Sequence, residues 1–165
     1  LVQDGEYFFM EVNARVQVEH PVSESISGVD IVREQIRACS GEALSVTQDD
    51  ITLLGYSLEC RINAKAPGTA GLYLPPGGFR VRVDSFLYSG CKILPYYDSM
   101  IAKVIIHADS RQEGITRMER ALSEFILEGI PTNIEQQRTI LAHPLFRRGD
   151  FGTDLLFKVF KEGKR

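Results

Sequence analysis

Residues 11–20 have the sequence EVNARVQVEH, and the rest of the chain can be interpreted outward from them. In an extended strand, successive side chains point to opposite faces. One face would then be wholly polar, with Glu11, Asn13, Arg15, Gln17 and Glu19, and the other wholly apolar. Carboxylates, a guanidinium and carboxamides can together bind a metal ion, hold a small planar anion and move a proton. The alternative is a solvated β face, because most alternating segments are simply amphipathic strands.

Length, charge and cysteine content limit the class of protein. The chain has 165 residues, of which 44% are hydrophobic, which is enough for a folded core. Its formal net charge is −3 and both signs are spread along it, so we expect no nucleic-acid track and no membrane-binding patch. Cys39, Cys60 and Cys91 are too few and too scattered for a disulfide framework or a zinc site, which indicates a reducing, cytoplasmic location. No apolar run approaches a membrane span, and the first residues lack the features of a signal peptide.

The first residues indicate a β-hairpin. Leu1 and Val2 precede an Asp-Gly turn at residues 3–6, and residues 7–13 would form the returning strand. A lone hairpin is marginally stable, and the sequence does not begin with Met. We therefore expect the sequence to begin partway through a larger protein.

Two further elements are predicted in the first half of the chain. The His-Pro pair at residues 20–21 ends the strand, because Pro cannot continue a ladder. Asp30 is then the predicted N-cap of a short helix that stops at Gly41. Alternation over residues 56–64 predicts a strand that places Arg61 on a polar face. The alternative for Arg61 is a surface residue with an ordinary cross-strand partner.

The second half of the chain predicts two more strands. Residues 66–78 are rich in Pro and Gly and should form a loop, after which residues 79–83 alternate as a strand does. Residues 101–106 are apolar except for Lys103 and predict a central strand that is covered on both faces.

Helices are predicted to follow these strands. Ser110, with a Glu three residues later, forms a capping box that opens a helix closed by Gly129. Another helix should begin at Asn133 and stop near Pro144, and a last one should cover residues 153–161.

Six short blocks carry a resemblance to a known family. In chain order they are EVNARVQVEHPV, GVDIVREQI, ECRINA, PPGGFRVR, PYYDSMIAK and EGIPTN. Together they resemble the carboxyl-terminal part of biotin carboxylase, the ATP-grasp component of biotin-dependent carboxylases such as acetyl-CoA carboxylase of fatty acid biosynthesis. In this family, ATP and bicarbonate give carboxyphosphate, which supplies carbon dioxide to the N1 nitrogen of biotin.

The resemblance implies roles for the polar row. Glu11 and Asn13 resemble ligands of the Mg²⁺ or Mn²⁺ at the ATP phosphates, and their hard oxygen donors suit such an ion. Arg15, Gln17 and the backbone of Val18 resemble the bicarbonate site, where a guanidinium fork suits a planar oxyanion.

The resemblance also implies a general base and a biotin site. Glu19 resembles the base that removes the bicarbonate proton, and beside an arginine it should be ionised at neutral pH. Arg61 resembles the arginine that stabilises negative charge on the biotin ureido oxygen when N1 loses its proton. Asp98 resembles a residue close to the same pocket, without an assigned role. Phe79 and Arg82 resemble part of the surface through which bacterial biotin carboxylases form two-fold dimers.

The implied fold is α+β, an antiparallel sheet with packed helices. The sheet is expected to contain the strands around Tyr7, Tyr56, Phe79 and Met100, with the helices after Ser110 and Asn133 packed on it. Residues 1–45 would be the trailing edge of an ATP-grasp domain, and residues 46–165 the biotin carboxylase C-terminal domain.

The implied cofactors and substrates are ATP, Mg²⁺ or Mn²⁺, bicarbonate and biotin. The implied partners are a biotin carboxyl carrier protein, a carboxyltransferase and a second copy in a homodimer. The family's nucleotide loop and phosphate-binding lysines would precede Leu1, so we expect this chain alone to be inactive.

One connection departs from the family pattern. Between Asn63 and Gly77 the family carries several more residues than this sequence. We expect a loop to have been omitted between Lys65 and Ala66, and a normal Cα spacing of about 3.8 Å there would contradict this.

Two other functions compete with this interpretation. A related ATP-grasp ligase, such as a carbamoyl-phosphate synthetase or a purine-pathway carboxylase, would share Glu-x-Asn but not the blocks around Arg61 and Asp98. A noncatalytic dimerisation or assembly module would share the fold but would not need the polar row.

Overall fold

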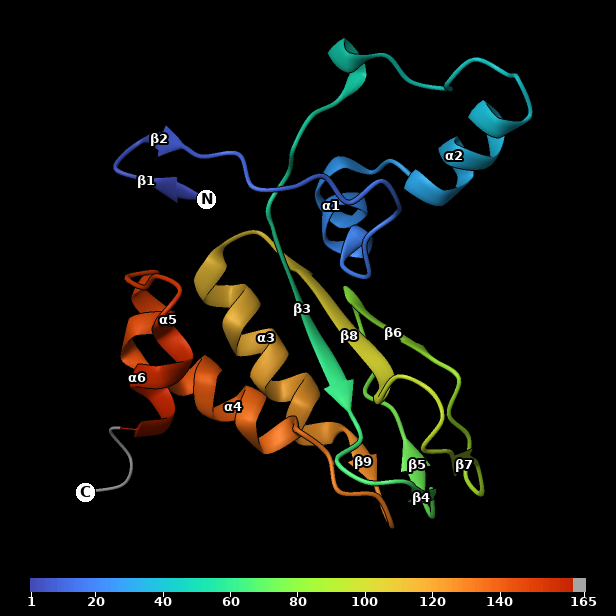
Figure 1. The fold of residues 1–165 in the computed structure, drawn as a ribbon, viewed down its shortest axis with the longest axis vertical. Helices are drawn as coiled ribbons and strands as arrows, with labels where there is room; N and C mark the ends of the chain where they lie inside the picture. Colours follow the sequence, from blue (N-terminus) through green and yellow to red (C-terminus); the bar gives the residue numbers. More distant parts are fainter. Residues whose placement is uncertain (162–165) are drawn as a thin grey trace.

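The computed structural model describes residues 1–161, and its centre is a three-stranded antiparallel sheet (Figure 1). The strand order is β3-β8-β6, where β3 is Tyr56–Asn63, β8 is Met100–Ala108 and β6 is Val81–Ser85. Ile105 and Ile106 of β8 are 1% and 0% exposed. The predicted central strand is therefore confirmed, because β8 lies between the other two strands.

One face of this sheet carries the main core. Cys60 and Ile62 of β3 and Val104 of β8 are buried there, together with Ile106. Helix α3 (Arg111–Glu124) packs against this face (Figure 1), and it contributes Ile115, Met118, Ala121 and Leu122 to the core.

The opposite face is charged. The register places Arg61 opposite Lys103, and Lys103 opposite Asp84, so one residue from each strand forms a row across the sheet. Helix α1 (His20–Ser27) contacts β3 and β8. This helix and the turn before it supply the ion-pair partners of the charged face, and they position the candidate site described below.

The remaining elements are short and surround this core. The strands are β1 (Val2–Gln3), β2 (Glu6–Tyr7), β4 (Gly68–Thr69), β5 (Tyr73–Leu74), β7 (Lys92–Ile93) and β9 (Ile126–Leu127). They form three separate pairs, β1 with β2, β4 with β7 and β5 with β9. The other helices are α2 (Ile31–Cys39), the 3-10 helix η1 (Gln48–Asp50), α4 (Ile134–Ala142), α5 (Pro144–Arg148) and α6 (Leu155–Lys161).

The prediction of a strand over residues 11–20 is wrong. Among residues 1–161 no strand pairs with this segment, and an unpartnered strand leaves its backbone groups without hydrogen bonds. Val12 is 73% exposed, so the apolar row does not form a buried face. The chain instead turns at residues 18–19 and enters α1 at His20.

Helix α1 was not predicted. Pro21 was interpreted as the end of a strand, yet Pro is also favoured in the first turn of a helix, where its missing N–H is not needed. Gly28 ends the helix with φ of 73°, a left-handed conformation that glycine adopts without strain. Both signals were present in the sequence.

Helix α3 ends earlier than predicted. It begins after Ser110, whose side chain accepts an amide hydrogen bond as expected, but it stops at Glu124. The chain then becomes extended and forms β9, which pairs with β5. Gly129 serves the following turn, with φ of 81°, where an added Cβ would lie 2.6 Å from the Thr69 carbonyl oxygen.

Two other details differ from expectation. Strand β6 starts at Val81, because Arg80 has φ of 58° and cannot belong to a strand. Tyr7 lies in the separate β1–β2 pair and does not join the main sheet. The α+β fold with an antiparallel sheet and packed helices is otherwise confirmed, as are α2 after Asp30 and α4 after Asn133.

The connection after β3 is short in this chain. Lys65 directly precedes Ala66 in this sequence, and the omission of a loop between them stays a prediction. The Lys65 N–H donates to the Pro131 carbonyl at 2.7 Å, and β4 begins at Gly68.

The structure also gives the state of the cysteines and the character of the helices. Cys39, Cys60 and Cys91 are all free thiols. In the described part of the chain, no helix combines the length and the apolar character that crossing a bilayer requires.

Candidate active site

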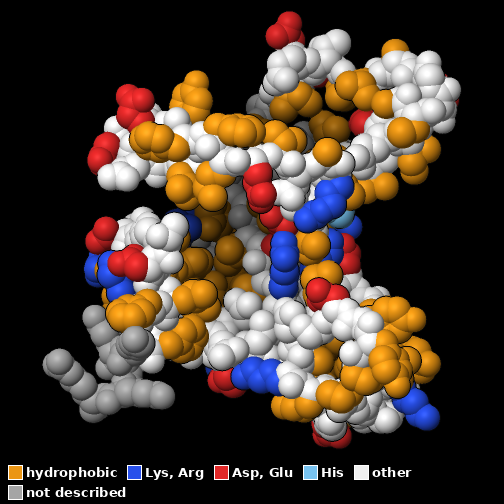
Figure 2. Space-filling view, in the orientation of Figure 1, with side chains coloured by type: hydrophobic (Ala, Val, Ile, Leu, Met, Phe, Trp, Pro, Cys, Tyr) orange, Lys and Arg blue, Asp and Glu red, His pale blue; other side chains and the backbone are white. Residues whose placement is uncertain are grey.

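Arg61 and Glu19 form an ion pair across 42 residues of sequence. Arg61 Nη2 donates to Glu19 Oε2 at 2.5 Å. Strand β3 places Arg61 on the charged face of the sheet, and the turn before α1 holds Glu19 against it. The side chains are 47% and 52% exposed, so a solute can reach both. Figure 2 shows acidic and basic side chains close together near the middle of the molecule, where its amino-terminal part meets the sheet.

The surroundings of Glu19 favour its ionised form. Its own backbone N–H is the largest influence that lowers the pKa of the carboxyl, and Arg61 and Arg15 lower it further against the opposing effect of desolvation. Glu19 is therefore a carboxylate at neutral pH, which is the state that a proton acceptor requires.

The segment before Glu19 carries a second polar group. Arg15 Nη1 donates to Gln17 Oε1 at 3.3 Å and to the Val16 carbonyl at 3.2 Å. The Gln17 carbonyl in turn lies 2.8 Å from Nδ1 of His20, at the start of α1. Arg15 and Gln17 thus lie in the irregular segment that leads into the turn at residues 18–19, instead of along a strand.

Lys103 lies beneath this turn and was not singled out as a site residue. Its Nζ donates to the Val18 carbonyl at 3.0 Å and lies 3.4 Å from Asp84 Oδ2. The side chain is only 11% exposed. The signal in the sequence was a single charge within an apolar strand, which was interpreted only as part of a buried element.

Glu59 lies two residues before Arg61 on the same face and is buried, with 4% of its side chain exposed. Its Oε1 is 3.9 Å from Arg61 Nε, and among the described residues neither carboxylate oxygen accepts a hydrogen bond. Burial raises the pKa of Glu59, while Lys103 and Arg61 act in the opposite direction. The Arg61–Glu19 pair therefore lies next to a buried carboxylate that has little access to water.

Asn133 binds the backbone of β3 immediately after the Arg61 side chain. Its Oδ1 accepts from the Asn63 N–H at 2.8 Å, and its Nδ2 donates to the Arg61 carbonyl at 3.0 Å. Gln137, one turn into α4, donates to the same carbonyl at 3.3 Å. Asn133 was predicted only as a helix start, and its side chain makes no capping bond.

Three predicted site residues are not drawn into this cluster. Glu11 and Asn13 are exposed, and among the described residues no hydrogen bond or ion pair engages either side chain, although the Asn13 carbonyl accepts from the Arg15 N–H at 2.8 Å. Asp98 is exposed, and its Oδ1 accepts from the Met100 N–H at 2.8 Å, which shapes the turn into β8. Within residues 1–161, no group of three or more His, Cys, Asp or Glu side chains could bind a metal ion by itself.

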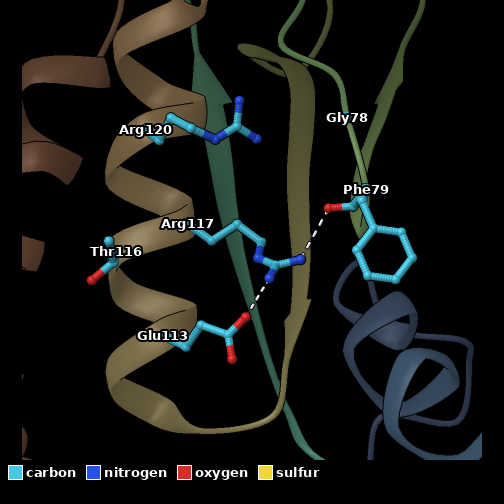
Figure 3. Close-up of a pocket in the computed structure, with 6 residues that line it drawn as sticks. All are labelled: Gly78, Phe79, Glu113, Thr116, Arg117 and Arg120. Atoms are coloured by element: carbon cyan, nitrogen blue, oxygen red, sulfur yellow. Dashed lines mark hydrogen bonds and ion pairs between the residues drawn. The ribbon is translucent and has the colours of Figure 1, made fainter.

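The predicted dimer residues differ in their surroundings. Phe79 is 79% exposed and borders a groove of about 440 Å³ on α3, which is lined also by Gly78, Glu113, Thr116, Arg117 and Arg120 (Figure 3). The Phe79 carbonyl accepts from Arg117, which is paired with Glu113 (Figure 3). Arg82 already binds Asp84 through two bonds of 2.7 and 2.9 Å and lies 3.2 Å from Glu24 of α1.

Comparison with known proteins gives matches over nearly the whole chain. The family model described as "Biotin carboxylase C-terminal domain" matches residues 59–158. The model described as "Carbamoyl-phosphate synthase L chain, ATP binding domain" matches residues 1–47.

Individual relatives agree with these matches. The chain is 51% identical over 161 residues to biotin carboxylase 1 of Bacillus subtilis, with 93% of this chain and 36% of the relative covered. It is 46% identical over 165 residues to biotin carboxylase of Pseudomonas aeruginosa, with 96% of this chain and 37% of the relative covered. The chain therefore spans little more than a third of the length of these relatives.

A solved structure is similar to this chain over most of its length. It is the biotin carboxylase domain dimer of 2-oxoglutarate carboxylase from Hydrogenobacter thermophilus, in complex with MgADP, ADP and bicarbonate. The TM-score is 0.92 at 43% sequence identity, with 94% of this chain and 36% of that chain covered.

Proposed function

The chain belongs to the biotin carboxylase family, and we propose that it supplies the bicarbonate and biotin side of a biotin carboxylase active site. The observation that carries the proposal is the Arg61–Glu19 ion pair. It joins a cation suited to oxyanion stabilisation and an ionised carboxylate suited to proton transfer, and both are open to solvent.

Glu19 is proposed as the base for bicarbonate. Its lowered pKa keeps it ionised but makes it a weak base, so proton removal must accompany attack of bicarbonate on the phosphoryl group. Arg15 and Gln17 would hold the planar anion beside it, with the Val18 backbone, through donors in the segment that leads into this turn.

Arg61 is proposed to act in the second step. When N1 of biotin loses its proton, negative charge develops on the ureido oxygen, and a fixed guanidinium stabilises it without reorganisation. Arg61 is suited to this because Asn133 and Gln137 fix its backbone and Glu59 lies behind its Nε.

Glu11 and Asn13 are proposed to bind part of a Mg²⁺ or Mn²⁺ site. A carboxylate and a carboxamide that are exposed and unengaged offer the oxygen donors that such ions prefer. When bound, the ion would neutralise charge on the ATP phosphates.

The wider context is also proposed. Residues 1–45 would complete an ATP-grasp domain and residues 46–165 would form the C-terminal domain. The full protein would use ATP to carboxylate biotin on a carrier protein, would act with a carboxyltransferase, and would dimerise through the surface that includes Phe79 and Arg82. Acetyl-CoA carboxylase is one enzyme that would need this half-reaction, and Asp98 would lie near its biotin pocket.

A chimera tests the proposal. The matched region of Bacillus subtilis biotin carboxylase 1 is replaced by this chain, and bicarbonate-dependent ATP cleavage is measured with free biotin. We expect activity that falls about a hundredfold or more in Glu19→Gln and Arg61→Ala. Glu128→Gln and Arg148→Ala, exposed residues outside the site, are the matched controls and should retain activity. The unmodified 165-residue chain alone should be inactive.

Other results would change the conclusion. Activity that ignores both site substitutions would place the chemistry on other residues. A folded chimera without activity would favour the noncatalytic assembly module, for which the exposed Phe79 is the supporting feature.

A further inference from the structure

Among the described residues, Lys103 is the one cation of the charged face that binds the backbone of the substrate-facing turn. Its Nζ lies 3.0 Å from the Val18 carbonyl oxygen and 3.4 Å from Asp84 Oδ2. It comes from the middle of the central strand, which pairs with a neighbour on each side and is largely buried. The contact therefore joins the turn before α1 to the central strand of the sheet.

The Val18 carbonyl belongs to the same peptide unit as the Glu19 N–H. A peptide unit is planar and trans, so fixing the direction of its C=O also fixes the direction of its N–H. That N–H is the group with the largest effect on the ionisation of the Glu19 carboxyl. Lys103 thus holds the C=O of the planar Val18–Glu19 peptide, and the N–H of the same peptide acts on the Glu19 carboxylate.

Lys103 lies among charged groups of both signs. Its cross-strand neighbour is Arg61, and like charges directly opposite on a sheet repel each other. Asp84 of β6 lies 3.4 Å from its Nζ. Glu59 of β3 and Glu19 of the turn are the other carboxylates nearby, and Lys103 favours the ionised form of Glu59. A methionine would fill a similar volume but would leave these carboxylates without the cation, so the charge at residue 103 balances the face while its Nζ also holds the turn.

We infer that Lys103 is a positioning residue that holds the Val18–Glu19 peptide on the sheet and so sets where the Glu19 carboxylate meets Arg61. The catalytic consequence rests on the function proposed above, but the positioning itself does not. It predicts that Glu19 loses both its N–H contact and its Arg61 contact when the anchor is removed.

The first test is a carboxyl ¹³C NMR titration of Glu19 in the 165-residue chain. In Lys103→Met, the pKa of Glu19 should rise toward the usual glutamate value, whereas Lys103→Arg keeps the charge and the donor and should stay close to native. Lys92→Met, an exposed lysine on β7, is the matched control and should leave Glu19 unchanged. Lys103→Gln, which ends one atom short of Nζ, gives the same readout if Lys103→Met does not fold.

A double-mutant cycle separates positioning from simple loss of positive charge. Arg61→Met should raise the pKa of Glu19 in the native background, because the ion pair is lost. In the Lys103→Met or Lys103→Gln background the same change should have a clearly smaller effect, since Glu19 no longer meets Arg61. Equal effects in both backgrounds would mean that Lys103 acts only through its charge, and the inference would be overturned.

The chimera provides the catalytic readout. Lys103→Met should lower kcat by about tenfold to a hundredfold, the scale of a displaced reacting group, with a smaller change in Lys103→Arg. Unchanged kcat and unchanged Glu19 titration in an otherwise active chimera would overturn the role of Lys103 alone. An inactive native chimera would count against the proposed function, while the titration of Glu19 would still decide the positioning.

Discussion

Replacing Asn133 by Ala should destabilise the fold and displace Arg61 at the same time. The substitution leaves the half-buried Asn63 N–H without its acceptor at 2.8 Å and removes one of two donors to the Arg61 carbonyl. The first loss should cost about 1 to 1.5 kcal/mol, and the second about 0.5 kcal/mol because Gln137 still donates. No helix-capping loss is added, since the Asn133 side chain caps nothing. The total is about 1.5 to 2 kcal/mol.

Urea unfolding of the chain measures this prediction, with Asn133→Asp as the matched variant. Aspartate keeps the acceptor for the Asn63 N–H but loses the donor to the Arg61 carbonyl, so its cost should be about 0.5 kcal/mol, a quarter to a third as large. In the chimera, Asn133→Ala should also lower kcat about tenfold, because the backbone that carries Arg61 is released. A loss below about 0.5 kcal/mol, or equal losses in both variants, would refute the claim that these two bonds hold β3.

Two further predictions concern packing and pH. Gly114→Ala should destabilise the chain by about 1 to 2 kcal/mol in thermal or urea unfolding despite the better helix propensity of Ala, because its Cβ would lie 2.6 Å from the Tyr56 ring and 3.1 Å from Ile106 Cδ1. A stabilised variant would show that the contact between α3 and the sheet is looser than described. Because the folded-state pKa of Glu19 is lowered, its pair with Arg61 contributes stability above the usual glutamate range and loses it as pH falls through the lowered value. Arg61→Met should therefore lower the melting temperature at pH 7 and have no effect in strong acid, and a pH-independent difference would contradict this.

The elements that could be predicted are those whose signals are local. Asp30 and Ser110 cap α2 and α3 with their side chains, and a nearly unbroken apolar run marks β8. Each signal depends on a few neighbouring residues, and nothing distant in the chain overrides it. The ends were harder to predict, because the end of α3 depends on β9 finding β5 rather than on a stop signal.

The segment at residues 11–20 shows why alternation alone was misleading. Its polar and apolar residues alternate from residue 11 to residue 19, yet a strand needs a neighbour to accept its hydrogen bonds, and no described strand lies beside it. The pairing of Glu19 with Arg61 could be expected only from the family resemblance. The two residues are 42 positions apart, and no periodic pattern in the sequence connects positions that distant. Lys103 was overlooked because its role depends on a carbonyl, which no side-chain pattern reveals.

The charged face explains how one small sheet can serve both stability and chemistry. The face that packs on α3 is apolar and supplies the core, so the other face is free to carry charges at some cost. Arg61 and Lys103 lie opposite each other there, which repulsion disfavours, and a carboxylate faces each of them: Glu19 above Arg61 and Asp84 beside Lys103. Glu59 adds a buried carboxylate to this face, so cations and carboxylates balance there. Apolar residues would satisfy the same register without desolvating any charge, so the charged row is better explained by the chemistry proposed for it than by the fold that it supports.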